Sequence, residues 1–133
     1  MKAKPNSVRR LSSSMEDYLE AVALLKKDKG VARVRDISRL LQVKTPSVSG
    51  ALSSLSKKGL LIHERYGYVN LTPRGERLAD DIQRRHGMLI RFLTEVLGID
   101  RATATKDACR MEHSISPQTF RKFTKFMEST DDE

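Results

Sequence analysis

Two short helical patterns joined by a three-residue turn restrict the fold of this chain more than any other feature. Residues 34–41 place apolar side chains on one face of a helix, and residues 42–44 (QVK) have the character of a tight turn. Thr45 then caps a second helix, with Pro46 at its first position, where proline is tolerated. Gly59 ends that helix. Two short helices joined in this way predict a helix-turn-helix.

The outward face of the second helix carries small, mostly hydroxyl-bearing residues. They are Ser47, Ser49, Gly50, Ser53 and Ser54. Small polar side chains allow a helix to approach the floor of a DNA groove closely. The alternative interpretation is a helical hairpin whose outside is simply polar.

Residues 61–71 follow directly and alternate in polarity, which predicts a two-stranded hairpin with its turn near Tyr66 and Gly67. A helix-turn-helix followed by a hairpin is a winged helix. The tip of this wing offers Arg65, Tyr66 and Tyr68 to a DNA backbone or minor groove.

The charge of the chain supports a polyanionic partner. The formal net charge is +8, and residues 33–85 hold eleven Lys or Arg against five Asp or Glu, a surplus of +6. Basic surfaces bind nucleic acid because phosphate contacts release counterions. Aromatic residues make up only 5% of the chain and Trp is absent, so a base-stacking platform for single strands is disfavoured and duplex DNA is favoured.

The remaining patterns predict a mainly α protein. Helices are expected over residues 12–29, capped by Ser13 or Ser14, and over residues 72–96, with further helices starting at Asp100 and Ser116. The expected organisation is a flexible basic tail (1–12), a winged-helix domain (13–74), a helical domain (75–128), to which the family resemblance described below assigns dimerisation and metal binding, and a disordered acidic tail (129–133). A single cysteine and no apolar run near 18 residues favour a soluble, cytoplasmic protein without a membrane partner.

One segment concentrates groups that bind metal ions. Cys109, Glu112 and His113 lie at positions i, i+3 and i+4, so a helix places all three on one face, where they can chelate a transition ion. The plainer alternative is a core cysteine beside a surface Glu–His pair. An enzyme with a Cys–His nucleophilic pair is a third possibility, but no oxyanion-hole loop or orienting group accompanies it, so we expect no enzymatic activity and no small organic substrate.

Four separated stretches resemble the diphtheria toxin repressor and manganese transport regulator family (DtxR/MntR). They are MEDYLEAV, ARVRDISRLLQVKTPSVSGALSSLSKKGLLIHERYGYVNLTPRGERLA, RRHGMLIRFL and DACRMEHSIS. The resemblance runs from about residue 14 to 127 and indicates a short form without an SH3-like domain. It implies a homodimeric repressor that controls metal-homeostasis genes and binds double-stranded operator DNA when Mn(II) or Fe(II) orders the dimer.

The resemblance also implies metal ligands. They fall on Asp17, Glu20, His86, Cys109, Glu112 and His113. Asp17, Cys109, Glu112 and His113 would form a primary site, and Glu20 with His86 a weaker ancillary site that shares Glu112, so one or two ions per subunit are expected. The match is mixed, because Asp17 and Glu20 resemble the manganese branch, whereas Cys109 resembles the iron branch, and a thiolate favours softer ions than Mn(II).

A predicted DNA-binding set completes the expectations. It comprises Arg33, Arg35, Lys44, Thr45, Pro46, Ser47, Ser49, Gly50, Ser53, Lys57, Arg65 and Tyr66. Gly50 departs from the family, which often has a longer polar side chain there, and this favours readout of DNA shape and phosphates over direct base contact. The rival functions are a metal-independent winged-helix regulator and a purely structural interaction module.

Overall fold

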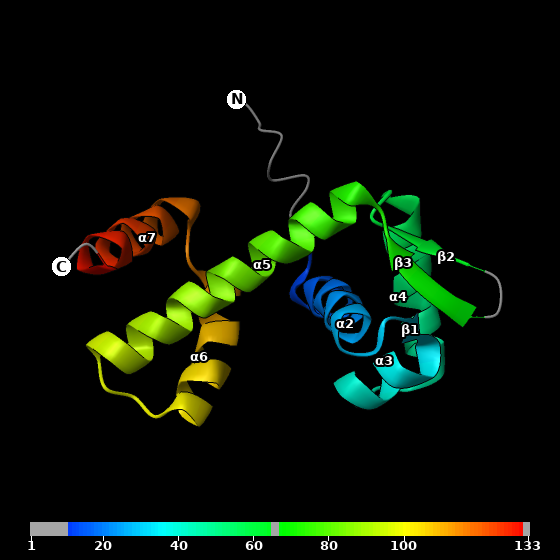
Figure 1. Cartoon of the computed structure of the whole chain (residues 1–133), viewed down its shortest axis with the longest axis horizontal. Coiled ribbons are helices and arrows are strands. Elements are labelled where there is room, and N and C mark those ends of the chain that lie inside the picture. Colours follow the sequence, from blue (N-terminus) through cyan, green and yellow to red (C-terminus); the bar gives the residue numbers. More distant parts are fainter. Residues whose placement is uncertain (1–10, 65–66, 132–133) are drawn as a thin grey trace. The chain divides into compact units, whose positions relative to one another are not determined.

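The computed structural model of the chain describes residues 11–64 and 67–131 (Figure 1). Most of the predicted basic tail, the wing-tip residues Arg65 and Tyr66 and the last two residues lie outside these ranges. The chain divides into two compact units between Asp80 and Asp81, inside helix α5 (Pro73–Arg91). Within the described ranges, no helix is both long and apolar enough to cross a lipid bilayer.

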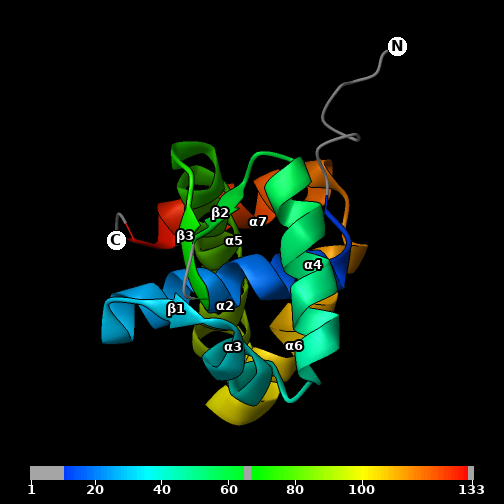
Figure 2. The same ribbon diagram turned by 90° about the vertical axis from the view of Figure 1, so that its right-hand side faces the viewer.

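In its described residues, the first unit contains three whole helices, the first residues of α5 and a small antiparallel sheet. The helices are α2 (Ser13–Lys29), α3 (Val34–Leu41) and α4 (Thr45–Lys57), and the strands are β1 (Ala32–Arg33), β2 (Leu61–His63) and β3 (Tyr68–Leu71). The three helices pack against one another, β3 lies against α2, and β2 lies against α4 (Figure 2). The predicted winged helix-turn-helix is therefore confirmed.

The sheet has one strand more than the predicted hairpin. Its order is β1-β3-β2, with Ala32 opposite Val69 and Leu61 opposite Leu71. The sequence did not indicate β1, because a strand of two residues is too short to show alternation. β1 matters for function because it places Arg33 opposite Tyr68 on β3.

Apolar side chains from every helix of the first unit meet in one core. The fully buried members include Leu19, Val22, Ile37, Val48, Leu52, Leu55, Leu61 and Val69. Burying a side chain of this size contributes about 1.5–3 kcal/mol, so the core fixes α2, α3 and α4 relative to one another. On α2, Leu25 is buried and its neighbour Leu24 is exposed.

Two helix starts differ from the sequence-based expectation. Ser12, not Ser13 or Ser14, caps α2, because its Oγ accepts a hydrogen bond from the backbone N–H of Met15 at 3.2 Å. Lys44 precedes α4 without a side-chain cap, so Thr45 is the first helical residue rather than the cap and Pro46 is the second. Proline is still tolerated there, because the first turn of a helix lacks intrahelical partners for its N–H groups.

The second unit is entirely helical. It comprises the C-terminal part of α5 (Pro73–Arg91), the π-helical turn η2 (Phe92–Val96), α6 (Arg101–Ser114) and α7 (Pro117–Asp131). The expected caps at its later helices are confirmed: Asp100 accepts from the N–H of Thr103 at 3.0 Å, and Ser116 accepts from the N–H of Thr119 at 3.1 Å.

The ends of two helices in the second unit depart from prediction. The long helix was expected to continue to Val96, but its last five residues widen into η2, where the N–H of Leu97 reaches the carbonyl of Phe92 at 3.3 Å. The tail expected to be disordered from residue 129 is helical through Asp131. The carboxylate of Asp131 holds it there by accepting hydrogen bonds from Arg91 at 2.6 and 3.2 Å.

Helices α5, η2 and α6 enclose the core of the second unit. Leu89, Leu93, Ala104 and Ala108 are buried at its centre. Aromatic rings of α7 cover them, with the ring centroids of Phe92 and Phe123 4.8 Å apart in an edge-on arrangement. The two alanines of α6 allow that helix to approach α5 closely, and this brings Glu112 of α6 next to Arg85 and His86 of α5.

Candidate metal centre and DNA-binding face

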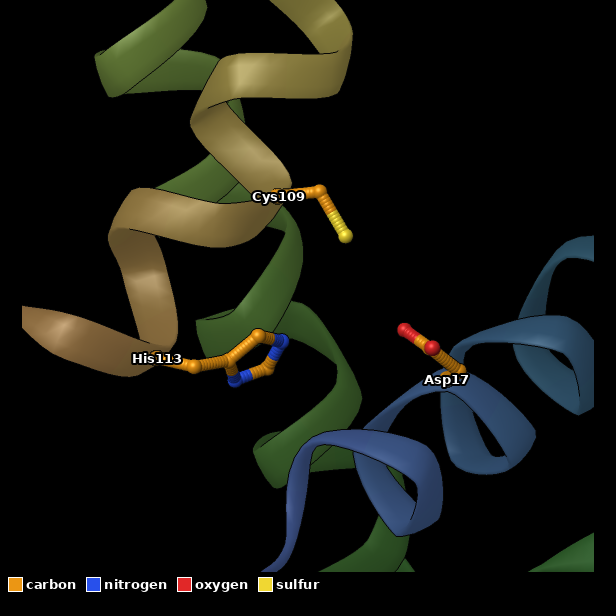
Figure 3. A group of neighbouring side chains, drawn as sticks. All are labelled: Asp17, Cys109 and His113. Carbon is orange, nitrogen blue, oxygen red and sulfur yellow. The ribbon is translucent and has the colours of Figure 1, made fainter.

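Helix α6 presents the predicted thiol, carboxylate and imidazole on adjacent turns. Figure 3 shows the side chains of Cys109 and His113 projecting from the same side of α6. The Cys109 Sγ and an imidazole nitrogen of His113 lie within 4.8 Å of each other, and so do a carboxylate oxygen of Glu112 and an imidazole nitrogen of His113. The i, i+3, i+4 spacing has therefore placed His113 near both the thiol of Cys109 and the carboxylate of Glu112.

Glu112 is the most buried of these groups, with 2% of its surface exposed. Its Oε2 accepts two hydrogen bonds from Arg85, from Nε at 3.1 Å and from Nη2 at 2.7 Å. Its Oε1 lies 2.5 Å from Nε2 of His86. Burial by itself raises the pKa of the Glu112 carboxyl, but the hydrogen bonds and charges of His86 and Arg85 outweigh burial and lower the pKa from 4.5 to about 2. Glu112 is therefore ionised at neutral pH, which a metal ligand requires.

Two imidazoles approach the same carboxylate oxygen. The Nε2 of His113 is 3.9 Å from Oε1 of Glu112, and the Nε2 of His86 approaches it from α5. A thiol, two imidazoles and an ionised carboxylate form a donor set that suits a first-row transition ion. The residues present in this unit thus fit the metal that the sequence predicted, and His86 lies against Glu112, the residue with which it was expected to share an ion.

The remaining predicted ligands lie on α2 in the first unit. Asp17 and Glu20 are partly exposed and are separated by three positions on that helix, and Figure 3 shows Asp17 on α2. Their participation in a metal site stays a prediction. Glu16, on the same helix, is buried with 4% exposed surface.

Arg85 is a residue of the candidate site that the sequence did not single out. In the sequence, Arg85 counted only toward the positive charge of residues 33–85, because its partner Glu112 is 27 positions further along the chain. Only the packing of α5 against α6 reveals this contact.

The predicted DNA-binding set lies on the surface of the first unit where it is described. Ten of its twelve members are exposed: Arg33, Arg35, Lys44, Thr45, Pro46, Ser47, Ser49, Gly50, Ser53 and Lys57. The other two, Arg65 and Tyr66, lie outside the described residues. The exposed residues of α4 include no carboxylate, so this face presents hydroxyls and lysines to a partner.

A paired contact supports Arg33 at the base of the wing. Its Nη2 donates a hydrogen bond to the hydroxyl of Tyr68 at 3.0 Å, and its guanidinium carbon lies 5.0 Å from the centroid of the Tyr68 ring. A cation over an aromatic ring gains about 0.5–1 kcal/mol at an exposed site. Tyr68, expected at the wing tip, thus lies on β3 and orients a basic side chain.

Comparison with known proteins agrees with this two-unit arrangement. A model of the iron-dependent repressor N-terminal DNA-binding domain matches residues 10–69, and a model of the iron-dependent repressor metal-binding and dimerisation domain matches residues 72–132. The chain is 40% identical to the HTH-type transcriptional regulator MntR of Lysinibacillus sphaericus over 103 residues, which are 77% of this chain and 73% of that protein. It is 32% identical to an uncharacterised HTH-type transcriptional regulator of Methanocaldococcus jannaschii over 92% of this chain and 98% of that one.

A solved structure extends the comparison to three dimensions. IdeR of T. acidophilum superposes with a TM-score of 0.75 at 26% sequence identity, covering 96% of this chain and 56% of that chain. This chain therefore spans little more than half of the length of that relative. The two matched domains, together with 40% identity over most of the chain, show that the protein belongs to the DtxR/MntR family of iron- and manganese-dependent transcriptional repressors.

Proposed function

We propose that this chain binds operator DNA as a homodimer when Mn(II) or Fe(II) occupies its metal site, and thereby represses metal-homeostasis genes. The observation that carries the proposal is the ionised, buried Glu112 with two imidazoles on one of its oxygens and a thiol on the same helix. These groups lie within residues 72–132, which match the metal-binding and dimerisation model.

We propose a division of the ligands into two groups. Cys109, Glu112 and His113 of α6 would form the primary site together with Asp17 of α2, and Glu20 with His86 would form the ancillary site. A divalent cation, when bound, supplies positive charge that several anionic and imidazole ligands can share. Because the ligands come from both units of the chain, their joint use of one ion would limit how the two units move relative to each other.

Helix α2 is well placed to transmit such a restriction to DNA. Its buried residues Leu19 and Val22 belong to the core that also contains Ile37 of α3 and Leu52 of α4. The first unit is therefore expected to move as one body, so that fixing Asp17 also fixes the direction of α4. Without the restriction, the DNA-competent arrangement is a minor population, and the apparent affinity falls by that fraction.

On the DNA side, we propose that α4 enters a major groove and that Arg33, Lys44 and Lys57 contact phosphates. Two recognition helices in a symmetric dimer would meet half-sites about one helical turn or a multiple apart. Such a protein acts in the cytoplasm, where its operator lies, and needs no catalytic group. The relatives named above are transcriptional regulators, which supports a ligand role rather than a nucleophilic role for Cys109.

The substitution Asp17→Ala tests the proposal. It should leave the fold and the dimer intact, because Asp17 does not belong to the buried core of the first unit. It should abolish the increase in operator affinity on addition of Mn(II) or Fe(II), which we expect to be on the order of 5–150-fold for the unaltered chain. Fluorescence anisotropy of labelled operator DNA, measured on metal-stripped protein at fixed salt, gives both affinities.

Asp28→Ala is the matched control, because Asp28 is an exposed acid on the same helix outside the ligand set. It should respond to metal as the unaltered chain does. A metal response that survives in Asp17→Ala would exclude α2 from the site. Equal operator affinity with chelator and with metal in the unaltered chain would favour a metal-independent winged-helix regulator.

A further inference from the structure

We infer that Arg85 is a positioning residue that reserves one oxygen of Glu112 and keeps the metal affinity of the site below the value that the carboxylate alone would give. The inference rests on the proposed metal-dependent function and concerns how that same site is regulated. It comes from contacts within the second unit that the residue spacing did not indicate.

The two oxygens of Glu112 have different neighbours. Oε2 accepts both hydrogen bonds from the guanidinium of Arg85, at 2.7 and 3.1 Å. Oε1 faces the imidazoles of His86 at 2.5 Å and His113 at 3.9 Å. A cation that is to share ligands with either histidine must therefore bind Oε1, while Arg85 retains Oε2. Arg85 thus selects a monodentate carboxylate and determines which oxygen it offers.

The guanidinium is itself held in place from a second side. Its Nη1 lies 3.5 Å from Oδ2 of Asp81, one turn earlier on α5. With one carboxylate on each side and 19% of its side chain exposed, Arg85 has a defined position rather than a freely rotating one. When a metal ion withdraws negative charge from Glu112, the carboxylate of Asp81 still balances part of the positive charge of Arg85.

A fixed positive charge beside the site has a predictable consequence. It stabilises the ionised Glu112 in the absence of metal, and it repels an incoming cation through a partly buried, weakly screened environment. Both effects weaken metal binding relative to a neutral residue at position 85. The loss of an orienting hydrogen bond acts in the opposite direction. We expect the electrostatic terms to prevail, because Glu112 is 2% exposed and its other oxygen also contacts His86 of α5, so Arg85 is not the only group that orients the carboxylate.

The test is a metal titration of full-length variants. Arg85→Met removes the charge and the donors, Arg85→Gln keeps a donor without the charge, and Arg85→Lys keeps the charge. Mn(II) affinity is measured from the electron paramagnetic resonance signal of the free ion, and Co(II) coordination from visible absorption. Arg84→Met is the control, because Arg84 is an exposed neighbour that pairs with Asp81 at 2.9 Å.

The expected result is Mn(II) binding tighter on the order of tenfold in Arg85→Met, with a smaller gain in Arg85→Gln. Arg85→Lys and Arg84→Met should stay within about twofold of the unaltered chain. The Co(II) spectrum should change only in Arg85→Met, where the second oxygen of Glu112 becomes available. If Arg85→Met does not fold, the comparison of Arg85→Gln with Arg85→Lys decides.

Unchanged or weaker Mn(II) binding in both neutral variants would overturn the inference while leaving the proposed function standing. Absence of Mn(II) and Co(II) binding in the unaltered chain would instead remove the proposed function. The two failures are therefore distinguishable in one series of titrations.

Discussion

Gly75 shows at the scale of one residue how the wing is joined to the long helix α5. Thr72 donates a hydrogen bond from Oγ1 to the carbonyl of Gly59 at 2.7 Å, and the same oxygen accepts from the N–H of Gly75 at 3.0 Å. A Cβ added at Gly75 would lie 1.9 Å from the carbonyl oxygen of Leu60. Because that neighbour is backbone, a side chain at position 75 forces the first turn of α5 away from the sheet.

We therefore predict that Gly75→Ala lowers the free energy of unfolding by about 1–3 kcal/mol, since overpacking of this kind displaces backbone. Gly87→Ala is the matched control in the same helix, because a Cβ there meets nothing within 4 Å. It should raise stability by about 0.5–1 kcal/mol through better helix propensity. Urea unfolding followed by circular dichroism measures both changes, and equal effects of the two substitutions would contradict the close contact.

Cys109 carries the second prediction at this scale, which concerns the choice of metal. A thiolate prefers softer ions, so Cys109→Glu should raise the affinity for Mn(II) relative to Co(II) on the order of tenfold, the lower end of ligand-environment effects. Cys109→Ser removes the thiolate without adding a carboxylate and should weaken the binding of both ions. Competition titrations with a chromophoric chelator give the affinities. An unchanged ratio in Cys109→Glu would show that Cys109 is not a ligand.

Among the helices and strands, the sequence predicted those features that depend on residues close together in the chain. The apolar spacing of α2, α3 and α4 and the caps at Asp100 and Ser116 depend on residues within a few positions of one another. The strand β1 is too short for a pattern. The helical end of α7 depends on the pairing of Asp131 with Arg91, 40 positions away, which no local rule reveals.

The candidate site divides in the same way. Cys109, Glu112 and His113 share one helix, so their spacing alone predicted a common face. Arg85 reaches Glu112 only because α5 and α6 pack against each other, and spacing along the chain contains no trace of that contact. The sequence therefore predicted the candidate ligands on α6 but did not predict that Arg85 pairs with Glu112.

Helix α6 provides a prediction for its N-terminal cap. The backbone N–H of Thr103 donates to the carboxylate of Asp100 and lowers the pKa of that carboxyl below its ordinary value of 3.8. A lowered pKa means that the charged cap stabilises the fold above pH 3.8 and that this contribution is lost as the pH falls through the lowered value. Asp100→Asn keeps a capping oxygen but does not titrate.

The free energy of unfolding of the unaltered chain should thus exceed that of Asp100→Asn at neutral pH, and the difference should shrink as the solution is acidified below the ordinary pKa of 3.8. Urea titrations of both proteins at several pH values measure the difference, from which other titrating groups cancel. A difference that does not depend on pH would contradict the charged cap.

Helix α4 provides a prediction for DNA binding. Lys44 is exposed immediately before the helix, so Lys44→Ala should weaken binding to operator and unrelated duplexes alike. The slope of log affinity against log salt should become shallower by about 0.9 for one lost phosphate contact. Lys106→Ala, an exposed lysine of the second unit, is the control and should leave the slope unchanged. Anisotropy titrations over a series of salt concentrations test this, and selective loss of operator binding alone would indicate base readout instead.

For the whole molecule, the central question is how metal binding and DNA binding are coupled between two compact units. The first unit exposes the predicted DNA-binding face, and the second contains most of the predicted metal ligands, including the buried Glu112. Coupling between binding sites is reciprocal, so operator DNA should tighten metal binding by the same factor by which metal tightens operator binding. Agreement of the two factors would show that one equilibrium links both sites.

Operator binding by the metal-stripped full chain tests most directly whether metal controls DNA binding. Anisotropy titrations would be performed without oxygen at fixed salt, in chelator, in Mn(II) and in Fe(II). We predict that either ion raises operator affinity at least about fivefold over chelator and that the gain disappears in Glu112→Gln. The same affinity in chelator and in both ions would contradict it, because the Cys109, Glu112 and His113 cluster would then have no influence on DNA.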